Sequence, residues 1–164
     1  YGYAESVPAL CETRWGQDAP YNNLCPTATD GTRTLTGCAA TSTAQVLFYH
    51  RAPEHGIGSH TIYYPANNMA GMKISVDFEK DNYDWNAMLE TYDAGYSTEE
   101  GDAVALIMRD LGVAFDMEYG SDAEGGSGAL HENVAIGLQR YYGIDDAKYI
   151  VLKDYSDEEW MRII

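Results

Sequence analysis

The sequence predicts an α+β fold in a single domain, and three observations support this prediction. Apolar residues make up 45% and charged residues 22% of the 164 residues, which is typical of a globular chain with its own core. Several segments repeat apolar residues at helical spacing, and two short segments alternate apolar and polar residues as strands do. Helices and short strands are therefore expected to share one core.

The N-terminal region is expected to be irregular. Residues 1–10 show no periodicity and contain Pro8, which predicts an extended arm. Residues 13–26 are rich in Asp, Asn and Pro and are predicted to form a loop, with Trp15 and Tyr21 as its anchors. An amide side chain such as that of Gln17 can stabilise an oxyanion when it lies beside a nucleophile. On its own, a glutamine in a loop is more often simply exposed to solvent.

Residues 39–49 are predicted to form a helix, with Thr34 and Thr36 as candidate caps before it. Four apolar residues fall on one face of this helix: Ala40, Ala44, Leu47 and Phe48. Cys38 then lies in the first turn, where free amides and the positive end of the helix dipole stabilise a thiolate. This position suits a nucleophile. The alternative is a small buried apolar residue, which is the commoner role of a free cysteine.

The rest of the chain predicts further helices and short strands. The clearest helix begins at Ser97, has Glu100 at the capping-box position, and ends at Gly112. Its expected buried stripe consists of Val104, Ile107, Met108 and Leu111. The other expected helices cover residues 83–89 and 133–142 and the segment after Ser156, and the expected strands cover residues 59–65, 72–78, 113–118 and 149–152.

A cysteine nucleophile needs a histidine within hydrogen-bond reach. His50 follows Cys38 by twelve residues on the same helix, about 18 Å away along the axis at 1.5 Å per residue, which is too far. His55 and His60 come after that distant end. His131 follows a Gly/Ser-rich loop and could approach the thiol, but isolated histidines usually fill surfaces or cores. His131 is therefore the weaker alternative for a catalytic base.

Charge and spacing exclude several classes of function. The formal charge of -16 argues against binding to nucleic acid or anionic membranes, and no apolar run has the length of a membrane span. The spacing of Cys, His, Asp and Glu predicts no zinc or calcium site, and residues 125–128 lack the context of a phosphate-binding loop. No metal and no cofactor are expected.

Three cysteines leave their pairing open. A bridge between Cys11 and Cys25 would leave Cys38 free, whereas a reducing compartment would keep all three thiols reduced. Sequence separation does not decide between these alternatives.

Four stretches resemble, in the same order, the streptopain family of papain-like cysteine proteases: residues 15–23, 36–50, 83–89 and 111–120. The most specific parts are the Gly-Cys-x-Ala-Thr-x-x-Ala-Gln pattern that contains Cys38 and the Trp-x-Gln-x-x-Pro-Tyr-Asn pattern that contains Gln17. The resemblance implies a papain-like fold with Cys38 as the attacking thiolate and Gln17 as a side-chain donor to the oxyanion hole. It also implies that Ser127, Gly128 and Ala129 form a loop that pairs with an extended substrate.

The family's catalytic histidine lies in the second half of the mature enzyme, so residues 1–164 are expected to be the N-terminal part of the catalytic domain. By itself this polypeptide is expected to be inactive, and a further segment or companion chain would supply the histidine. The resemblance further implies secretion or a cell-surface or periplasmic location, a protein or peptide substrate, and a propeptide whose junction lies near residues 1–10. One alternative is a non-catalytic relative or decoy that binds peptides, and a weaker one is an adhesin-like domain.

Overall fold

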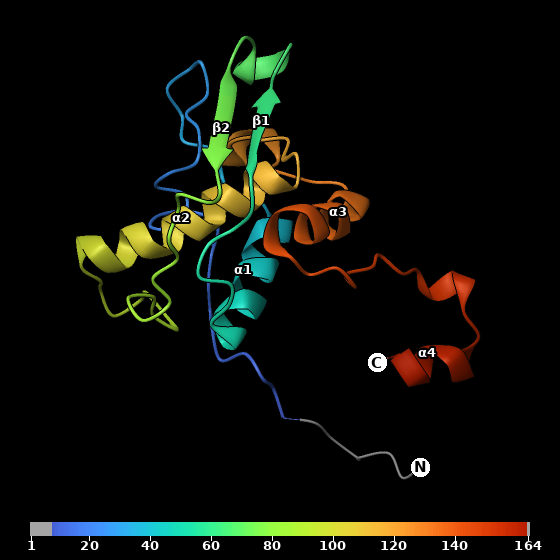
Figure 1. Cartoon of the computed structure of the whole chain (residues 1–164). Helices are drawn as coiled ribbons and strands as arrows, with labels where there is room; N and C mark the ends of the chain where they lie inside the picture. Colours follow the sequence, from blue (N-terminus) through green and yellow to red (C-terminus); the bar gives the residue numbers. More distant parts are fainter. Residues whose placement is uncertain (1–7, 164) are drawn as a thin grey trace.

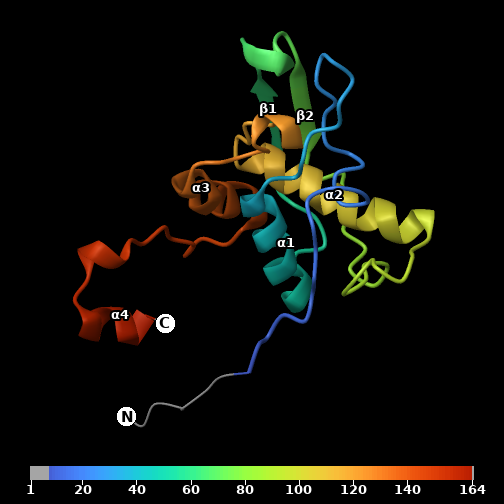
Figure 2. The same ribbon diagram turned by 180° about the vertical axis from the view of Figure 1, so that it is seen from behind.

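The computed structural model describes residues 8–163 and contains helices and one small sheet. The elements are α1 (Cys38–His50), β1 (Ser59–Tyr63), β2 (Lys73–Asp77), α2 (Thr98–Ala114), α3 (His131–Tyr142) and α4 (Asp157–Ile163). Short 3-10 helices cover Asn67–Met69, Asp122–Glu124 and Leu152–Asp154. Helix α2 packs against α1, α3 and both strands, so it is the helix at the middle of this arrangement (Figure 1). Helix α4 lies apart from the other helices in both views (Figures 1 and 2).

Helix α2 has the capping box and the buried stripe that the sequence predicts. The hydroxyl of Ser97 accepts a hydrogen bond from the N–H of Glu100 at 3.3 Å, and the Glu100 carboxylate accepts the N–H of Ser97 at 2.6 Å. The four residues of the expected stripe are fully buried. The predicted end at Gly112 is wrong, because the helix continues to Ala114. A side chain at position 112 would collide with the hydroxyl of Tyr119, so this glycine provides space and does not end the helix.

Helix α1 covers the predicted range, and its four predicted face residues are buried. Its start differs from the expectation, because Gly37 is the N-cap and no side chain caps the helix. Thr36 instead hydrogen-bonds the hydroxyl of Thr41 at 2.8 Å, and Thr41 donates to the carbonyl oxygen of Gly37 at 3.0 Å. The threonines therefore fix the turn before the helix and leave its first N–H groups without a side-chain acceptor.

The two predicted strands at residues 59–65 and 72–78 are present as β1 and β2, each slightly shorter. They pair antiparallel, with Ser59 opposite Asp77 and Tyr63 opposite Lys73. Their hairpin projects from one end of α2 (Figure 1).

Three other predicted elements are wrong. Residues 83–89 form a turn and no helix. The Asp84 carboxylate accepts the N–H groups of Asn86 and Ala87, as a helix cap would, but the turn ends at residue 87. The strand expected at residues 113–118 is replaced by the end of α2 and an isolated bridge. Residues 149–152 form no strand, since no neighbouring strand pairs with them within the described residues.

The N-terminal segment is irregular where it is described, and the cysteines near it are unbridged. Residues 1–7 of the predicted arm lie outside the described residues, and residues 8–10 are exposed and form neither helix nor strand. Cys11 and Cys25 are not bridged: Cys11 is exposed, whereas Cys25 is buried in the core.

Candidate active site

Cys38 is the first residue of α1, and its side chain is exposed. The N–H of Cys38 makes no hydrogen bond to a loop or turn carbonyl within the described residues. The first N–H groups of a helix have no partner inside the helix, and together with the helix dipole they stabilise a negative charge. The thiol and a free amide therefore lie together at a position that favours an anion.

Gly37 lets two other segments pack closely against the start of α1. Its backbone has a φ of 86° and a ψ of 141°, a conformation that side chains rarely permit. A Cβ atom at this position would lie 2.6 Å from the sulfur of Met117 and 3.3 Å from the carbonyl oxygen of Ser127. A glycine is thus required for the segments that contain Met117 and Ser127 to approach the start of α1.

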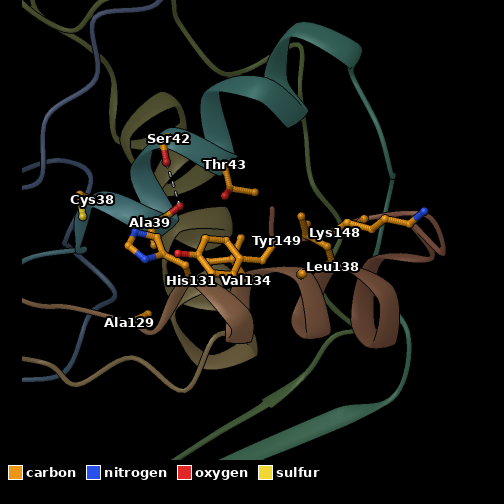
Figure 3. A pocket seen from close by; sticks show the side chains of 12 residues that line it. Cys38, Ala39, Ser42, Thr43, Ala129, His131, Val134, Leu138, Lys148 and Tyr149 are labelled. Carbon is orange, nitrogen blue, oxygen red and sulfur yellow. Dashed lines mark hydrogen bonds between the residues drawn. The ribbon is translucent and has the colours of Figure 1, made fainter. Parts of the chain in front are cut away.

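A cavity of about 370 Å³ opens beside Cys38, between the first turns of α1 and helix α3 (Figure 3). Most of its wall is apolar, and none of its lining residues carries a carboxylate, although the chain has 26 Asp and Glu residues. The lining residues are Cys38, Ala39, Ser42, Thr43, Ala129, His131, Val134, Ala135, Leu138, Ala147, Lys148 and Tyr149. A cavity of this kind suits an apolar side chain of a ligand held next to the thiol.

His131 lies in the same cavity as Cys38, which the sequence indicated only weakly. It begins α3, and its ring stacks on that of Tyr149, with the centroids 5.5 Å and the planes 11° apart (Figure 3). No hydrogen bond joins it to Cys38 within the described residues, and His50 is at the opposite end of α1. The positions of His131, Val134 and Leu138 follow helical spacing, and this pattern could have identified the wall of the cavity.

The loop that contains Gln17 lies beside the start of α1. The carbonyl oxygen of Gln17 accepts the N–H of Thr36 at 3.1 Å, two residues before Cys38. Trp15 anchors the loop as predicted: its ring N–H donates to the carbonyl of Leu89 at 2.8 Å, and the ring is buried. The Gln17 side chain is half-buried and is not part of the cavity wall. Its role as an oxyanion donor stays a prediction.

The three residues of the predicted substrate loop have different partners. The hydroxyl of Ser127 bonds the carbonyl of Leu35 at 2.7 Å, which attaches the loop to the segment before α1. Gly128 exchanges two backbone hydrogen bonds with Glu118, at 2.8 and 3.0 Å. Ala129 lines the cavity. The backbone groups of Ser127 and Ala129 bond no other backbone group within the described residues, and the Ser127 carbonyl oxygen faces Gly37. The pairing of this loop with a substrate stays a prediction.

The other two cysteines have different environments from that of Cys38. Burial raises the pKa of the Cys25 thiol to about 12, although the Tyr119 hydroxyl and Arg33 act in the opposite direction. Cys11 is exposed, but it lies on the N-terminal arm near Gln45 and away from a helix start. Among residues 8–163 no group of three or more His, Cys, Asp or Glu side chains could hold a metal ion. In the same range, each helix is too short or too polar to cross a membrane.

Comparison with known proteins identifies relatives of this chain. The sequence model of the peptidase C10 family matches residues 15–164. Streptopain of Streptococcus pyogenes is 28% identical over 159 residues, which cover 89% of this chain and 39% of streptopain. The thiol protease/hemagglutinin PrtT of Porphyromonas gingivalis is 28% identical, and the match covers 92% of this chain and 17% of PrtT.

Solved structures agree with these matches. The structure of active wild-type interpain A cysteine protease of Prevotella intermedia superposes with a TM-score of 0.88 at 49% identity, covering 96% of this chain and 63% of that chain. A prointerpain A fragment superposes with a TM-score of 0.87 at 48% identity, covering 96% of this chain and 49% of that chain. The predicted papain-like α+β fold and the resemblance to streptopain are confirmed. This chain belongs to the peptidase C10 family.

Proposed function

We propose that this chain provides the nucleophile and part of the substrate cleft of a secreted bacterial cysteine endopeptidase. One observation carries the proposal: the exposed thiol of Cys38 lies at the first residue of α1 and borders an apolar cavity. The relatives named as cysteine or thiol proteases support the same chemistry. The chain spans 39% of streptopain and 63% of the interpain A chain, so the activity of the whole protein is part of the proposal.

The reaction begins when the Cys38 thiolate attacks the carbonyl carbon of a peptide bond. The oxygen of the tetrahedral intermediate accepts hydrogen bonds from the Cys38 N–H and the Gln17 side chain. Collapse of this intermediate breaks the C–N bond, and a histidine protonates the departing amine. Water then hydrolyses the thioester and regenerates the thiol. The bond between Gln17 and Thr36 supports the Gln17 role, because it holds the glutamine's loop beside the start of α1.

The histidine is the part that this chain does not supply in our proposal. His50 is at the opposite end of α1, and His131 makes no hydrogen bond to Cys38 within the described residues. We assign the histidine to a further segment of the protein or to a companion chain, so residues 1–164 are the N-terminal part of one papain-like domain. The polypeptide alone is then inactive.

The substrate is a protein or peptide that binds in an extended conformation along residues 127–129. The unpaired backbone groups of Ser127 and Ala129 support this binding mode, and Ala129 brings the peptide to the cavity beside Cys38. The relative described as prointerpain A supports a propeptide, whose junction we assign to the region of residues 1–10. The family resemblance also implies export from the cell.

A second candidate is a relative that binds peptides without cleaving them. No histidine bonds Cys38 within the described residues, and this favours the second candidate. A peptide could bind to the groups that are present, but it would not be cleaved.

Hydrolysis by residues 1–164, alone and joined to the histidine-bearing segment, separates the two candidates. We expect no cleavage of a fluorogenic peptide by the chain alone and cleavage by the joined protein, with Cys38→Ala as the inactive control. Cleavage by residues 1–164 that is lost in His131→Ala would instead make His131 the base. Tight peptide binding without cleavage by the joined protein would support the non-catalytic candidate.

A further inference from the structure

Glu118 faces an open surface next to the substrate loop. It pairs antiparallel with Gly128, and residues directly opposite each other in such a pair place their side chains on the same face. Gly128 has no side chain, and an added Cβ atom there would meet no other atom within 4 Å. The face that carries Glu118 is therefore open across Gly128.

The direction of the backbone groups then fixes where a substrate would lie. Successive residues of a strand point their N–H and C=O groups to opposite edges. Gly128 bonds Glu118 through both its N–H and its C=O group, and alternation turns the groups of Ser127 and Ala129 to the other edge. The Ser127 carbonyl oxygen faces Gly37 there, next to Cys38. Neighbouring strands are about 4.8 Å apart, so a peptide on that edge would have its backbone about 10 Å from that of Glu118. A long side chain opposite Gly128, together with that of Glu118, spans this gap.

The charge of Glu118 is uncompensated. Its carboxylate is exposed and makes no ion pair or side-chain hydrogen bond within the described residues. Asp116, in contrast, bonds the ring nitrogen of His60 at 2.7 Å. Both acidic residues line a cavity of about 320 Å³ whose wall includes Tyr63 and Tyr64. Aromatic rings and a free carboxylate together stabilise a cation.

We propose that Glu118 determines specificity by binding the lysine or arginine side chain of the substrate residue that lies opposite Gly128. The proposal rests on the peptide-binding part of the proposed function, because only an extended peptide on the loop brings a side chain to this face. An exposed ion pair changes affinity by about two- to fivefold. Salt screens such pairs, so the preference should fall at high ionic strength.

The test measures peptide binding to the complete protein, residues 1–164 with the histidine-bearing segment, in its Cys38→Ala form. Peptides carry lysine, or its neutral analogue norleucine, at each position in turn, and fluorescence anisotropy gives each Kd. We expect lysine to bind about two- to fivefold more tightly than norleucine at one position. Glu118→Gln should remove this preference. Asp102→Asn removes the same charge from the distant half of α2 and should retain it.

Equal affinities for lysine and norleucine at every position, or a preference that survives Glu118→Gln, would overturn the proposal. Hydrolysis of the norleucine peptides by the protein with Cys38 intact reports separately on the proposed function, because it does not need Glu118. A protein that cleaves them but shows no lysine preference keeps the function and loses this inference. A protein that cleaves nothing but shows the Glu118-dependent preference loses the protease function and keeps this inference.

Discussion

Helices α1 and α2 pack against each other, but their N-termini are built in opposite ways. At α2, the side chains of Ser97 and Glu100 bond each other's backbone N–H groups. At α1, the N-cap is Gly37, no side chain caps the helix, and its first turn has no acidic residue. A capping box stabilises a helix, whereas an uncapped start leaves N–H groups for a ligand or a charge. The uncapped start is the one that has the exposed thiol of Cys38.

The start of α1 is held by a hydrogen bond from within the helix and by contacts from elsewhere in the fold. The Thr41 hydroxyl donates to the Gly37 carbonyl, and Met117 and Ser127 lie close to Gly37. Packing around Gly37 therefore takes the place of a side-chain cap at α1, and no side chain among residues 8–163 caps its first N–H groups. Four substitutions test this difference.

The largest effect is expected for Cys38→Ala at the open helix start. Hydrolysis of a peptide by the complete protein should fall by about 10⁴-fold or more, because the nucleophile is removed. The free energy of unfolding should change by less than about 0.5 kcal/mol, because the side chain is exposed. Steady-state kinetics and urea denaturation provide the two measurements. Substantial residual hydrolysis would assign the nucleophile elsewhere.

Gln17→Ala should lower kcat of the complete protein by about 100-fold and leave KM nearly unchanged, since the donor acts on the charge that develops during attack. Gln45→Ala is the control. It removes the same amide from α1, where Gln45 bonds Thr13 at 2.8 Å and Thr41 at 3.3 Å. The control should affect stability and leave kcat almost unchanged. Equal losses of kcat in both variants would contradict the oxyanion role of Gln17.

Gly37→Ala should destabilise the protein by about 2–3 kcal/mol, because it combines backbone strain with a clash against Met117. Gly31→Ala is the matched control, since Gly31 has a φ of 88° but no atom within 4 Å of an added Cβ. It should cost about 1 kcal/mol, from backbone strain alone. Urea denaturation of both variants measures the difference, and equal costs would show that the close packing at α1 contributes nothing.

The smallest effect is expected at the capped helix. Ser97→Ala should lower the free energy of unfolding by about 1 kcal/mol, which is typical of a lost N-cap. The rate of Cys38 alkylation by iodoacetamide should not change, because the cap of α2 lies outside the site. A change in that rate would mean that the two helix starts are coupled.

Features that depend on residues close in sequence were the predictable ones. The capping box and the buried stripe of α2 depend on residues within a few positions of each other, and both were predicted correctly. The glycine at position 112 leaves space for Tyr119, and no local pattern distinguishes such a glycine from one that ends a helix. The apolar run at residues 149–152 suggested a strand, but a strand also needs a neighbour to pair with.

The candidate site likewise has one feature that local sequence predicts and others that depend on distant residues. The position of Cys38 at a helix start follows from local sequence, and the structure agrees with it. The sequence indicated the nearness of His131 to Cys38 only weakly, because it depends on how α2 positions α1 and α3. The open face beside Glu118 is likewise a property of two paired segments ten residues apart.

The hydroxyl of Ser127 has a mechanical consequence. It bonds the carbonyl of Leu35 and the N–H of Gly120, so residues 127–129 are joined to the segment that leads into α1. A displacement of this loop would act on Leu35 and, through the single residue Thr36, on Gly37. The loop is therefore linked to the start of α1 by one hydrogen bond and a short length of backbone. If a peptide binds this loop as proposed, its binding and the position of the Cys38 thiol are coupled through Leu35.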